Sequence, residues 1–340
     1  MGVMLTPILK REQTSLKALK GRSFAIDASI EIHQFLALVR KRDGSLFTDS
    51  QGRITSHLIG LLTRTSRLIA DFAMKPVFVF DGKPNPLKRR TLETRTEARK
   101  KAEVEYVEAV SKKDYAKAWS KAVMTGRVTG SVLDDSKRLL TLMGIPWLEA
   151  LEDAEAQASY MAARGDVWAV GSKDYDCLLY GAPILARYLT LTGREWLPAQ
   201  QRSRPLIPEL IKLSENLALL GITHEQLVDL AILVGTDFNQ GVKGIGPKKA
   251  LKLVHDYGSI ELMPEKIRSK LRDLNSVRQV FLKPRVLEKY LLKRSPPDRE
   301  GLIKFLSEER GFNKERVERL TERVTWKGEK TDAGLENWLN

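Results

Sequence analysis

The sequence predicts an α/β fold in which a mostly parallel central sheet is flanked by helices. Three short apolar segments, residues 23–26, 76–80 and 167–170, have the length of buried strands. An amphipathic helical pattern over residues 55–74 separates the first two, and alternating strands and helices are typical of a parallel sheet. An aspartate follows each apolar segment within a few residues. These carboxylates should therefore meet at the carboxyl edge of the sheet, where open α/β sheets carry their sites.

The composition indicates a folded protein that binds a polyanion. At 340 residues the chain forms either one large domain with insertions or two domains, and 42% hydrophobic residues suffice for a core. Lysine and arginine number 57 against 43 acidic residues, a net charge of +14. A surface rich in ion pairs would explain many charges but not the excess of one sign. Nucleic acid is therefore the first candidate partner.

The remaining compositional signals concern the compartment. The single cysteine, Cys177, excludes an intramolecular disulfide and a cysteine-based zinc site. The first residues lack the pattern of a secretory signal, and the apolar stretches are too short to span a bilayer. We therefore expect a cytoplasmic protein without membrane association that acts as a monomer.

The region from residue 88 to about 143 interrupts the strand pattern. It is rich in lysine and arginine and in helix-forming residues, which predicts one or two basic helices inserted into the sheet domain. Interleaved glutamates leave open an ordinary solvated helix surface with ion pairs. Beyond Tyr188 we expect mostly helices, and from about Trp326 a polar tail.

Seven carboxylates beside apolar segments are the candidate metal ligands. Any one of them could be a helix cap or a turn residue. Gathered at one sheet edge, they could not all stay ionised without counter-charge, because like charges raise each other's pKa. Hard oxygen ligands with few histidines favour Mg²⁺ or Mn²⁺, and two such ions about 4 Å apart hydrolyse phosphodiesters in many enzymes. The seven are Asp27, Asp81, Asp153, Glu155, Asp174, Asp176 and Asp237.

The segments that carry these acids resemble the archaeal-type flap endonucleases of the structure-specific 5′-nuclease family. They are residues 20–29, 77–84, 153–156, 174–178 and 233–238, and the resemblance covers nearly the whole chain. It implies one metal at Asp27, Asp81, Asp153 and Glu155, and a second at Asp174, Asp176 and Asp237. The family usually has glutamate at the position of Asp153, so this carboxylate arm is one methylene shorter.

Residues 241–250 have the form of a helix-hairpin-helix. Gly244 and Gly246 permit a tight turn, and Pro247 suits the first position of a helix. Backbone N–H groups at that helix start could hold a DNA phosphate, with Lys248 and Lys249 adding charge. The alternative is an ordinary glycine-rich turn. The resemblance implies that this motif grips the duplex arm and binds K⁺.

Further DNA contacts follow from the resemblance. Lys88 and Arg95 match the catalytic cations that the family's helical arch brings to the scissile phosphate. Gly2 matches a small residue close to the DNA junction. His33 stands where relatives usually have a stacking tyrosine, although a half-buried histidine is an equal alternative. Weaker candidates for backbone contacts are Arg40 and Arg64.

The resemblance also implies the domain organisation and the activity. We expect an N-terminal nuclease region over residues 1–98, an arch insertion over 99–135, and an internal nuclease region over 136–325 with the helix-hairpin-helix at 241–256. The expected reaction is hydrolysis of DNA at 5′-flap junctions in replication and repair, with 5′-to-3′ exonuclease activity and two Mg²⁺ ions. The rivals are a related exonuclease, a four-way-junction resolvase, and a non-catalytic adaptor that binds DNA or a clamp.

The tail, residues 326–340, carries a candidate partner motif. Leu335 and Trp338 are three residues apart, so one helical turn would place both on one face, with Leu339 beside them. Flap endonucleases commonly end in such a turn, which binds the ring-shaped sliding clamp. The alternative is an unstructured tail whose tryptophan packs on the parent domain.

Overall fold

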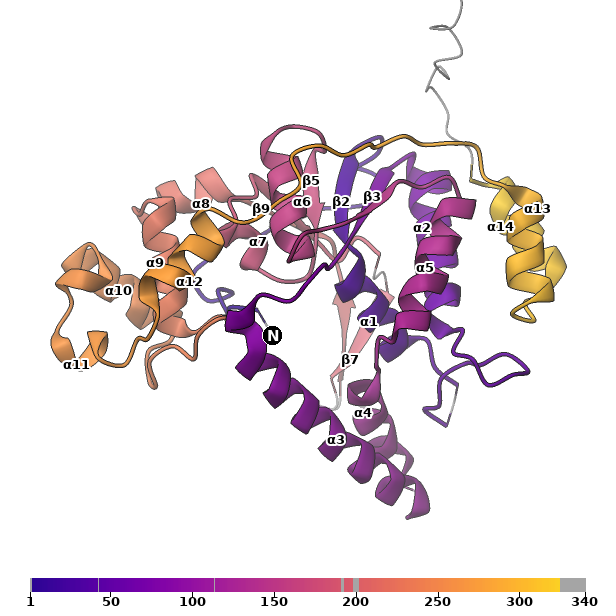
Figure 1. Ribbon diagram of the computed structural model, residues 1–340, viewed down its shortest axis with the longest axis horizontal. Coiled ribbons are helices and arrows are strands. Elements are labelled where there is room, and N and C mark those ends of the chain that lie inside the picture. Colours follow the sequence, from indigo (N-terminus) through magenta and orange to yellow (C-terminus); the bar gives the residue numbers. More distant parts are fainter. Residues whose placement is uncertain (1, 42, 113, 191–192, 198–201, 325–340) are drawn as a thin grey trace, which may run out of the picture.

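The computed structural model describes residues 2–41, 43–112, 114–190, 193–197 and 202–324. Within them a seven-stranded sheet has the order β1-β9-β6-β5-β2-β3-β4 (Figure 1). Strands β2 to β6 run parallel to their neighbours, whereas β9 pairs antiparallel with both β6 and β1. The bounds are Glu12–Gln13 for β1, Ser23–Asp27 for β2, Lys75–Phe80 for β3, Trp147–Glu149 for β4, Ala169–Gly171 for β5, Ile184–Arg187 for β6 and Glu209–Lys212 for β9. The predicted mostly parallel sheet is confirmed.

Helices cover both faces of this sheet because its central strands are apolar on both sides. Along β2 and β3, successive residues alternate between two separate clusters of buried side chains. Phe24 and Phe78 pack with helices α1 (Ala28–Leu38), α2 (Ser56–Phe72) and α5 (Gly130–Leu142). Ala25 and Val77 pack with α6 (Ala154–Ala163), α7 (Asp176–Leu179) and α9 (His224–Val234).

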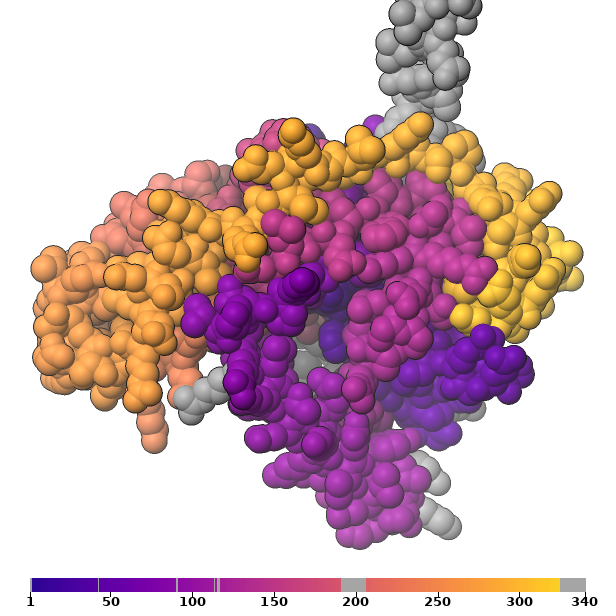
Figure 2. Space-filling view, in the orientation of Figure 1, coloured from indigo at the N-terminus to yellow at the C-terminus, as the bar shows by residue number. Residues whose placement is uncertain are grey.

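A pair of helices projects from the body of the molecule (Figures 1 and 2). After the short 3-10 helix η1 (Pro86–Lys88), α3 spans Arg89–Ser111 and α4 spans Tyr115–Thr125. Small residues at the interface, Ala102 and Ala109 on α3 and Ala118 and Ala122 on α4, are buried, so the two helices pack closely. The projecting pair runs from residue 89 to residue 125, whereas the arch insertion is predicted over residues 99–135.

Beyond Tyr188 the sequence predicts mostly helices, whereas the first elements there are strands. Strands β7 (Gly193–Leu197) and β8 (Arg202–Leu206) form a separate antiparallel pair, and β9 joins the main sheet. Such short strands carry too few residues for a clear period-two pattern, and β9 is stabilised by pairing with β6, a distant segment. Helices then dominate: α8 (Leu213–Leu220), α10 (Pro247–Tyr257), η3 (Ile260–Leu262), α11 (Glu265–Arg268), α12 (Leu274–Leu282), α13 (Arg299–Ile303), a π-helical turn (Lys304–Glu308) and α14 (Lys314–Glu322).

No single helix among the described residues is both long and apolar enough to cross a membrane. Only α8 and α9 taken together, with an 80° bend between them, reach that length and composition.

Candidate functional site

The structure brings the predicted acids to one edge of the sheet. Asp27 ends β2, Asp81 directly follows β3, and Asp174 lies three residues after β5. These three strands are neighbours and parallel, so their carboxyl ends meet. Asp153 precedes the first turn of α6, which holds Glu155, at the same edge.

Two of these acids also have local structural partners. Asp27 caps α1, since its Oδ1 accepts a hydrogen bond from the backbone N–H of Ile30 at 2.9 Å. Asp81 Oδ1 accepts from the backbone N–H of Ala154 at 2.9 Å and so ties the end of β3 to the start of α6. A carboxylate can therefore cap a helix or fix a turn and still belong to the site, because each of the two keeps a second oxygen that is available there.

Burial and mutual repulsion show how crowded the carboxylates are. Burial raises the pKa of Asp27 well above its usual value, and the charges of Asp81 and Asp174 add to the rise. The pKa of Glu155 is likewise raised by burial and then by Asp176, Asp174 and Asp27. Each ionised acid therefore makes ionisation of its neighbours harder, and positive charge bound among them would relieve this repulsion.

The N-terminal segment packs directly on Asp176. The backbone N–H of Val3 donates to Asp176 Oδ1 at 2.7 Å. A Cβ atom on Gly2 would lie 2.8 Å from the same oxygen, so a larger residue would push against the carboxylate. Burial raises the pKa of Asp176 to about 7 even though the Val3 N–H opposes the rise. The sequence predicts Gly2 near the DNA junction. The structure adds that a side chain at this position would collide with Asp176.

Two basic side chains at the base of the projecting helix pair supply counter-charge to Asp153 and Asp237. Lys88 Nζ donates to Asp153 Oδ1 at 2.6 Å, and Arg95 Nη2 lies 2.7 and 2.6 Å from the two oxygens of Asp237. Thr91 Oγ1 donates to the backbone carbonyl of Asp237 at 2.8 Å. Burial lowers the pKa of Lys88, but the charge and hydrogen bond of Asp153 outweigh it and raise the pKa overall. The first turns of α3 are thus attached to the acids.

The donor chemistry fits a divalent cation, although the ligands are not yet in place around one. Among the described residues, no three acidic, histidine or cysteine side chains converge closely enough to hold a metal ion as they stand. The available donors are carboxylate oxygens, and burial together with neighbouring acids raises the pKa of Asp27, Glu155 and Asp176, a cost that a hard dication would relieve. Asp153 and Asp237 are paired with Lys88 and Arg95, so a metal ion at either acid would share the carboxylate with that cation.

Arg187 is a residue that sequence reasoning missed. It lies on β6, is buried, and donates through Nε to the carbonyl of Lys173 at 2.9 Å. Its Nη1 donates to the hydroxyl of Tyr175 at 2.7 Å and to Glu209 at 3.0 Å. The guanidinium of Arg187 therefore binds the residues on both sides of Asp174 and fixes the loop that carries this acid. A lone arginine in a strand gave no signal of this in the sequence.

Glu31 is a second residue that the sequence did not single out, and it is a carboxylate. It lies on α1 one turn after Asp27, is only 6% exposed, and accepts a hydrogen bond from the Thr190 hydroxyl. Burial raises its pKa to about 7, while Thr190, Lys173 and Arg64 oppose the rise. Its charge also raises the pKa of Asp27.

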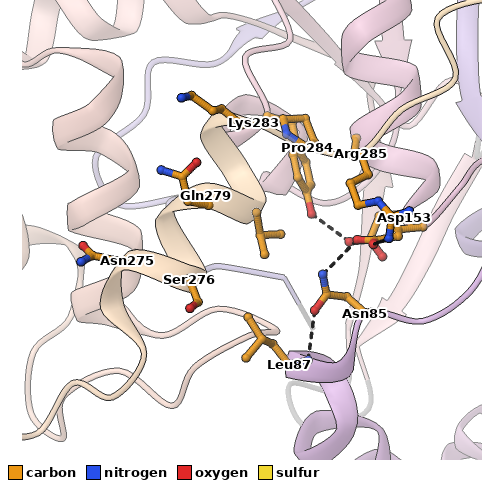
Figure 3. Close-up of a pocket in the computed structure, with 13 residues that line it drawn as sticks. Asn85, Leu87, Asp153, Asn275, Ser276, Gln279, Lys283, Pro284 and Arg285 are labelled. Atoms are coloured by element: carbon orange, nitrogen blue, oxygen red, sulfur yellow. Dashed lines mark hydrogen bonds and ion pairs between the residues drawn. The ribbon is translucent and has the colours of Figure 1, made fainter.

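Two cavities flank the acids. One, of about 1000 Å³, lies between α1 and the projecting pair α3 and α4. Gly2, His33, Arg95 and Asp174 are among the residues that line it. The other, of about 460 Å³, lies between η1 and α12, and Asp153 is in its wall. Figure 3 shows Asn85, Gln279 and Arg285 around this second cavity, beside Asp153.

The predicted DNA-contacting side chains differ in exposure. His33 is exposed and lines the larger cavity, although burial of its ring is enough to lower its pKa, and stacking on a base stays a prediction. Arg40 is half-buried and donates to the carbonyl of Gly44 at 2.8 Å. Arg64 is half-buried on α2 near Glu31. Contact of these two arginines with the phosphate backbone stays a prediction.

The predicted helix-hairpin-helix segment contains a glycine turn that leads into the start of a helix. Gly244 adopts a φ of +82°, a left-handed conformation that favours glycine. Gly246 is the residue before α10, and Pro247 is the first residue of that helix. Lys248 and Lys249 follow in the first turn and are exposed. Their contact with DNA stays a prediction, and the predicted clamp-binding residues Leu335, Trp338 and Leu339 lie outside the described residues.

Comparisons with known proteins agree with this site. The family model described as the XPG N-terminal domain matches residues 1–102, and that of the XPG I-region matches residues 144–237. The chain is 46% identical to flap endonuclease 1 of Pyrococcus abyssi over 325 residues, 95% of this chain and 94% of that protein. It is 43% identical to flap endonuclease 1 of Archaeoglobus fulgidus over the full length of both. The solved structure of flap endonuclease-1 from Methanococcus jannaschii superposes with a TM-score of 0.76 at 40% identity, covering 95% of this chain and 98% of that one.

Proposed function

The chain belongs to the flap endonuclease 1 family of XPG-type nucleases, and from this membership we propose a mechanism and the residues that perform it. It is a divalent-metal-dependent, structure-specific nuclease that hydrolyses DNA phosphodiesters at 5′-flap junctions, with 5′-to-3′ exonuclease activity, in replication and repair. The observation that carries the residue assignment is the gathering of carboxylates at one edge of the sheet, where Lys88 and Arg95 bind two of them, Asp153 and Asp237.

The acids at the sheet edge would hold the metal ions. Asp27, Asp81, Asp153 and Glu155 form one group and Asp174, Asp176 and Asp237 the other. Divalent ions bound there supply the Lewis acidity for hydrolysis of the phosphodiester. We propose Mg²⁺, with Mn²⁺ as a substitute, because every donor is a carboxylate oxygen.

Lys88 and Arg95 would act on the scissile phosphate. In the structure Lys88 is hydrogen-bonded to Asp153 and Arg95 to Asp237, two of the carboxylates that would hold the metal ions. A carboxylate has about four lone-pair sites, so these acids could hold metals while Lys88 and Arg95 remain beside them and donate to the phosphate oxygens as well. There they offset the negative charge that grows in the transition state, without a covalent intermediate.

The first turn of α10 would grip the duplex. Exposed Lys248 and Lys249 stand beside the N–H groups at the start of that helix, an arrangement that binds phosphate irrespective of base sequence. A K⁺ ion at the same motif and a sliding clamp bound through Trp338 are finer parts of the proposal, supported by the sequence pattern alone.

The test is cleavage of a matched panel of DNAs. Labelled 5′-flap, nicked, gapped and four-way-junction substrates of the same sequence are incubated with the full chain, in Mg²⁺ and in EDTA. We expect the flap to be cut fastest, near its junction, only when Mg²⁺ is present. Preferred cutting of the four-way junction would favour the resolvase, and binding without any cutting would favour the adaptor, although all seven acids are present.

A further inference from the structure

Tyr180 donates a hydrogen bond to an acid of the site. Its hydroxyl lies 2.8 Å from Asp153 Oδ2, in a buried position directly after α7. Burial, followed by the charges of Asp153 and Glu155, raises the pKa of Tyr180 well above its usual value. The hydroxyl therefore keeps its proton and is the donor. The other oxygen of Asp153 accepts from Lys88, so both carboxylate oxygens are engaged by side chains of this chain.

Tyr180 is also linked to Lys88 through a chain of packed aromatic side chains. Its ring packs on Phe281 of α12, with centroids 5.0 Å apart. Phe281 packs edge-on against Phe238, with centroids 5.3 Å apart. Lys88 Nζ lies 4.9 Å from the centroid of Phe238, within the range of a cation–π contact. The five side chains Lys88, Asp153, Tyr180, Phe281 and Phe238 thus form a closed ring of contacts.

This ring restrains an otherwise flexible side chain. A lysine has four rotatable side-chain bonds, so holding its ammonium group in one place costs rotamer entropy. Lys88 Nζ is held from one side by a carboxylate and from the other by an aromatic face. The carboxylate, in turn, cannot rotate freely, because its second oxygen is bound to Tyr180. Asp153 has a short arm, with one rotatable bond fewer than glutamate, so a partner at each oxygen fixes its plane.

We propose that Tyr180 is a positioning residue for DNA cleavage, which acts through Asp153 to hold Lys88 beside the reacting phosphate. The inference rests on the proposed function of Lys88. Tyr180 touches neither substrate nor reacting atoms, and its effect on the reaction passes through the orientation of Asp153.

The test removes only the hydroxyl, with Tyr180→Phe in the full chain. Single-turnover cleavage of a 5′-flap DNA in Mg²⁺ should slow roughly tenfold, the expected effect of losing a hydrogen bond to a charged group. Flap binding measured with Ca²⁺ in place of Mg²⁺ should change little. Tyr290→Phe is the matched control, because the Tyr290 hydroxyl also donates to an aspartate, Asp166, but lines a separate surface pocket. It should cleave at the wild-type rate.

A second background separates positioning from general damage. In Lys88→Ala protein, which should cut slowly but measurably, Tyr180→Phe should have no further effect, because the side chain it positions is gone. A purely structural role would slow cleavage equally in both backgrounds. Thermal unfolding of each variant shows whether it folds.

A metal-free readout tests the same contact without activity. The ¹⁵N resonance of the Lys88 ammonium, identified by its loss in Lys88→Ala, should be visible in wild type and broadened in Tyr180→Phe as its proton exchange accelerates. The inference is overturned if Tyr180→Phe cleaves like wild type, if it slows both backgrounds equally, or if the resonance is unchanged. Failure of the wild-type protein to cut the flap would instead overturn the proposed function.

Discussion

Replacing Glu31 with glutamine should stabilise the metal-free protein at alkaline pH. Burial raises the pKa of this carboxyl from 4.5 to about 7. A raised carboxyl pKa means that folding is favoured while the group is protonated. The stability it supports is complete below pH 4.5 and is lost as the pH rises through about 7. Above that pH an ionised Glu31 is buried on α1, and a neutral glutamine removes that penalty.

The size of the effect follows from the shift. A pKa rise of about 2.5 units corresponds to roughly 3 kcal/mol of destabilisation at pH 8. For a chain of this length, an unfolding entropy of roughly 0.7 kcal/mol per kelvin converts this to about 4–5 °C in Tm. At pH 5 the folded protein holds Glu31 mostly protonated, so the gain should shrink to roughly a quarter. Glutamine keeps an oxygen that can accept the hydrogen bond from Thr190.

Differential scanning fluorimetry of wild type and Glu31→Gln in EDTA, at pH 5 and pH 8, measures this directly. Glu103→Gln on the exposed surface of α3 is the control and should leave Tm unchanged at both pH values. An equal shift at the two pH values, or a lower Tm for Glu31→Gln at pH 8, would refute the account of a buried ionised carboxylate.

Three further predictions concern the reaction. Asp174→Ala should abolish cleavage in Mg²⁺ yet bind flap DNA in EDTA at least as tightly as wild type, because it removes negative charge; near-normal cutting would exclude Asp174 as a metal ligand. Lys88→Ala and Arg95→Ala should each slow single-turnover cleavage roughly a hundredfold with little change in Kd, the cost of one lost transition-state contact; a large loss of affinity with an unchanged rate would make them binding residues. Lys248→Ala with Lys249→Ala should weaken binding to every sequence and lower the slope of log K against log salt by about 2, and an unchanged slope would remove them from the DNA interface.

The sheet and its acids could be predicted because their signal is local. Asp27 and Asp81 directly follow apolar strands, and parallel strands necessarily bring such residues to one edge. The start of α10 was predicted for the same reason, since glycine and proline fix the turn within a few residues of one another. Strand β9 was missed, because its place depends on a distant partner in the chain and four residues show no period.

The pairings within the site could not be predicted, because they join distant segments. Lys88 and Asp153 are 65 positions apart and Arg95 and Asp237 are 142 apart. The sequence identified the two cations and the two acids but not that they bind each other. Tyr180 gave no signal at all, since a tyrosine in an apolar segment reads as a core residue and only the fold directs its hydroxyl at a carboxylate.

Anomalous diffraction from crystals soaked in Mn²⁺ tests most directly whether these acids hold the catalytic ions. Data collected at the manganese edge from the full chain bound to 5′-flap DNA should show two peaks about 4 Å apart. One should lie against Asp27, Asp81, Asp153 and Glu155, the other against Asp174, Asp176 and Asp237, with Lys88 and Arg95 within hydrogen-bond distance of the phosphate. Absence of manganese at this edge of the sheet, in crystals that contain the bound DNA, would contradict the assignment of the metal site.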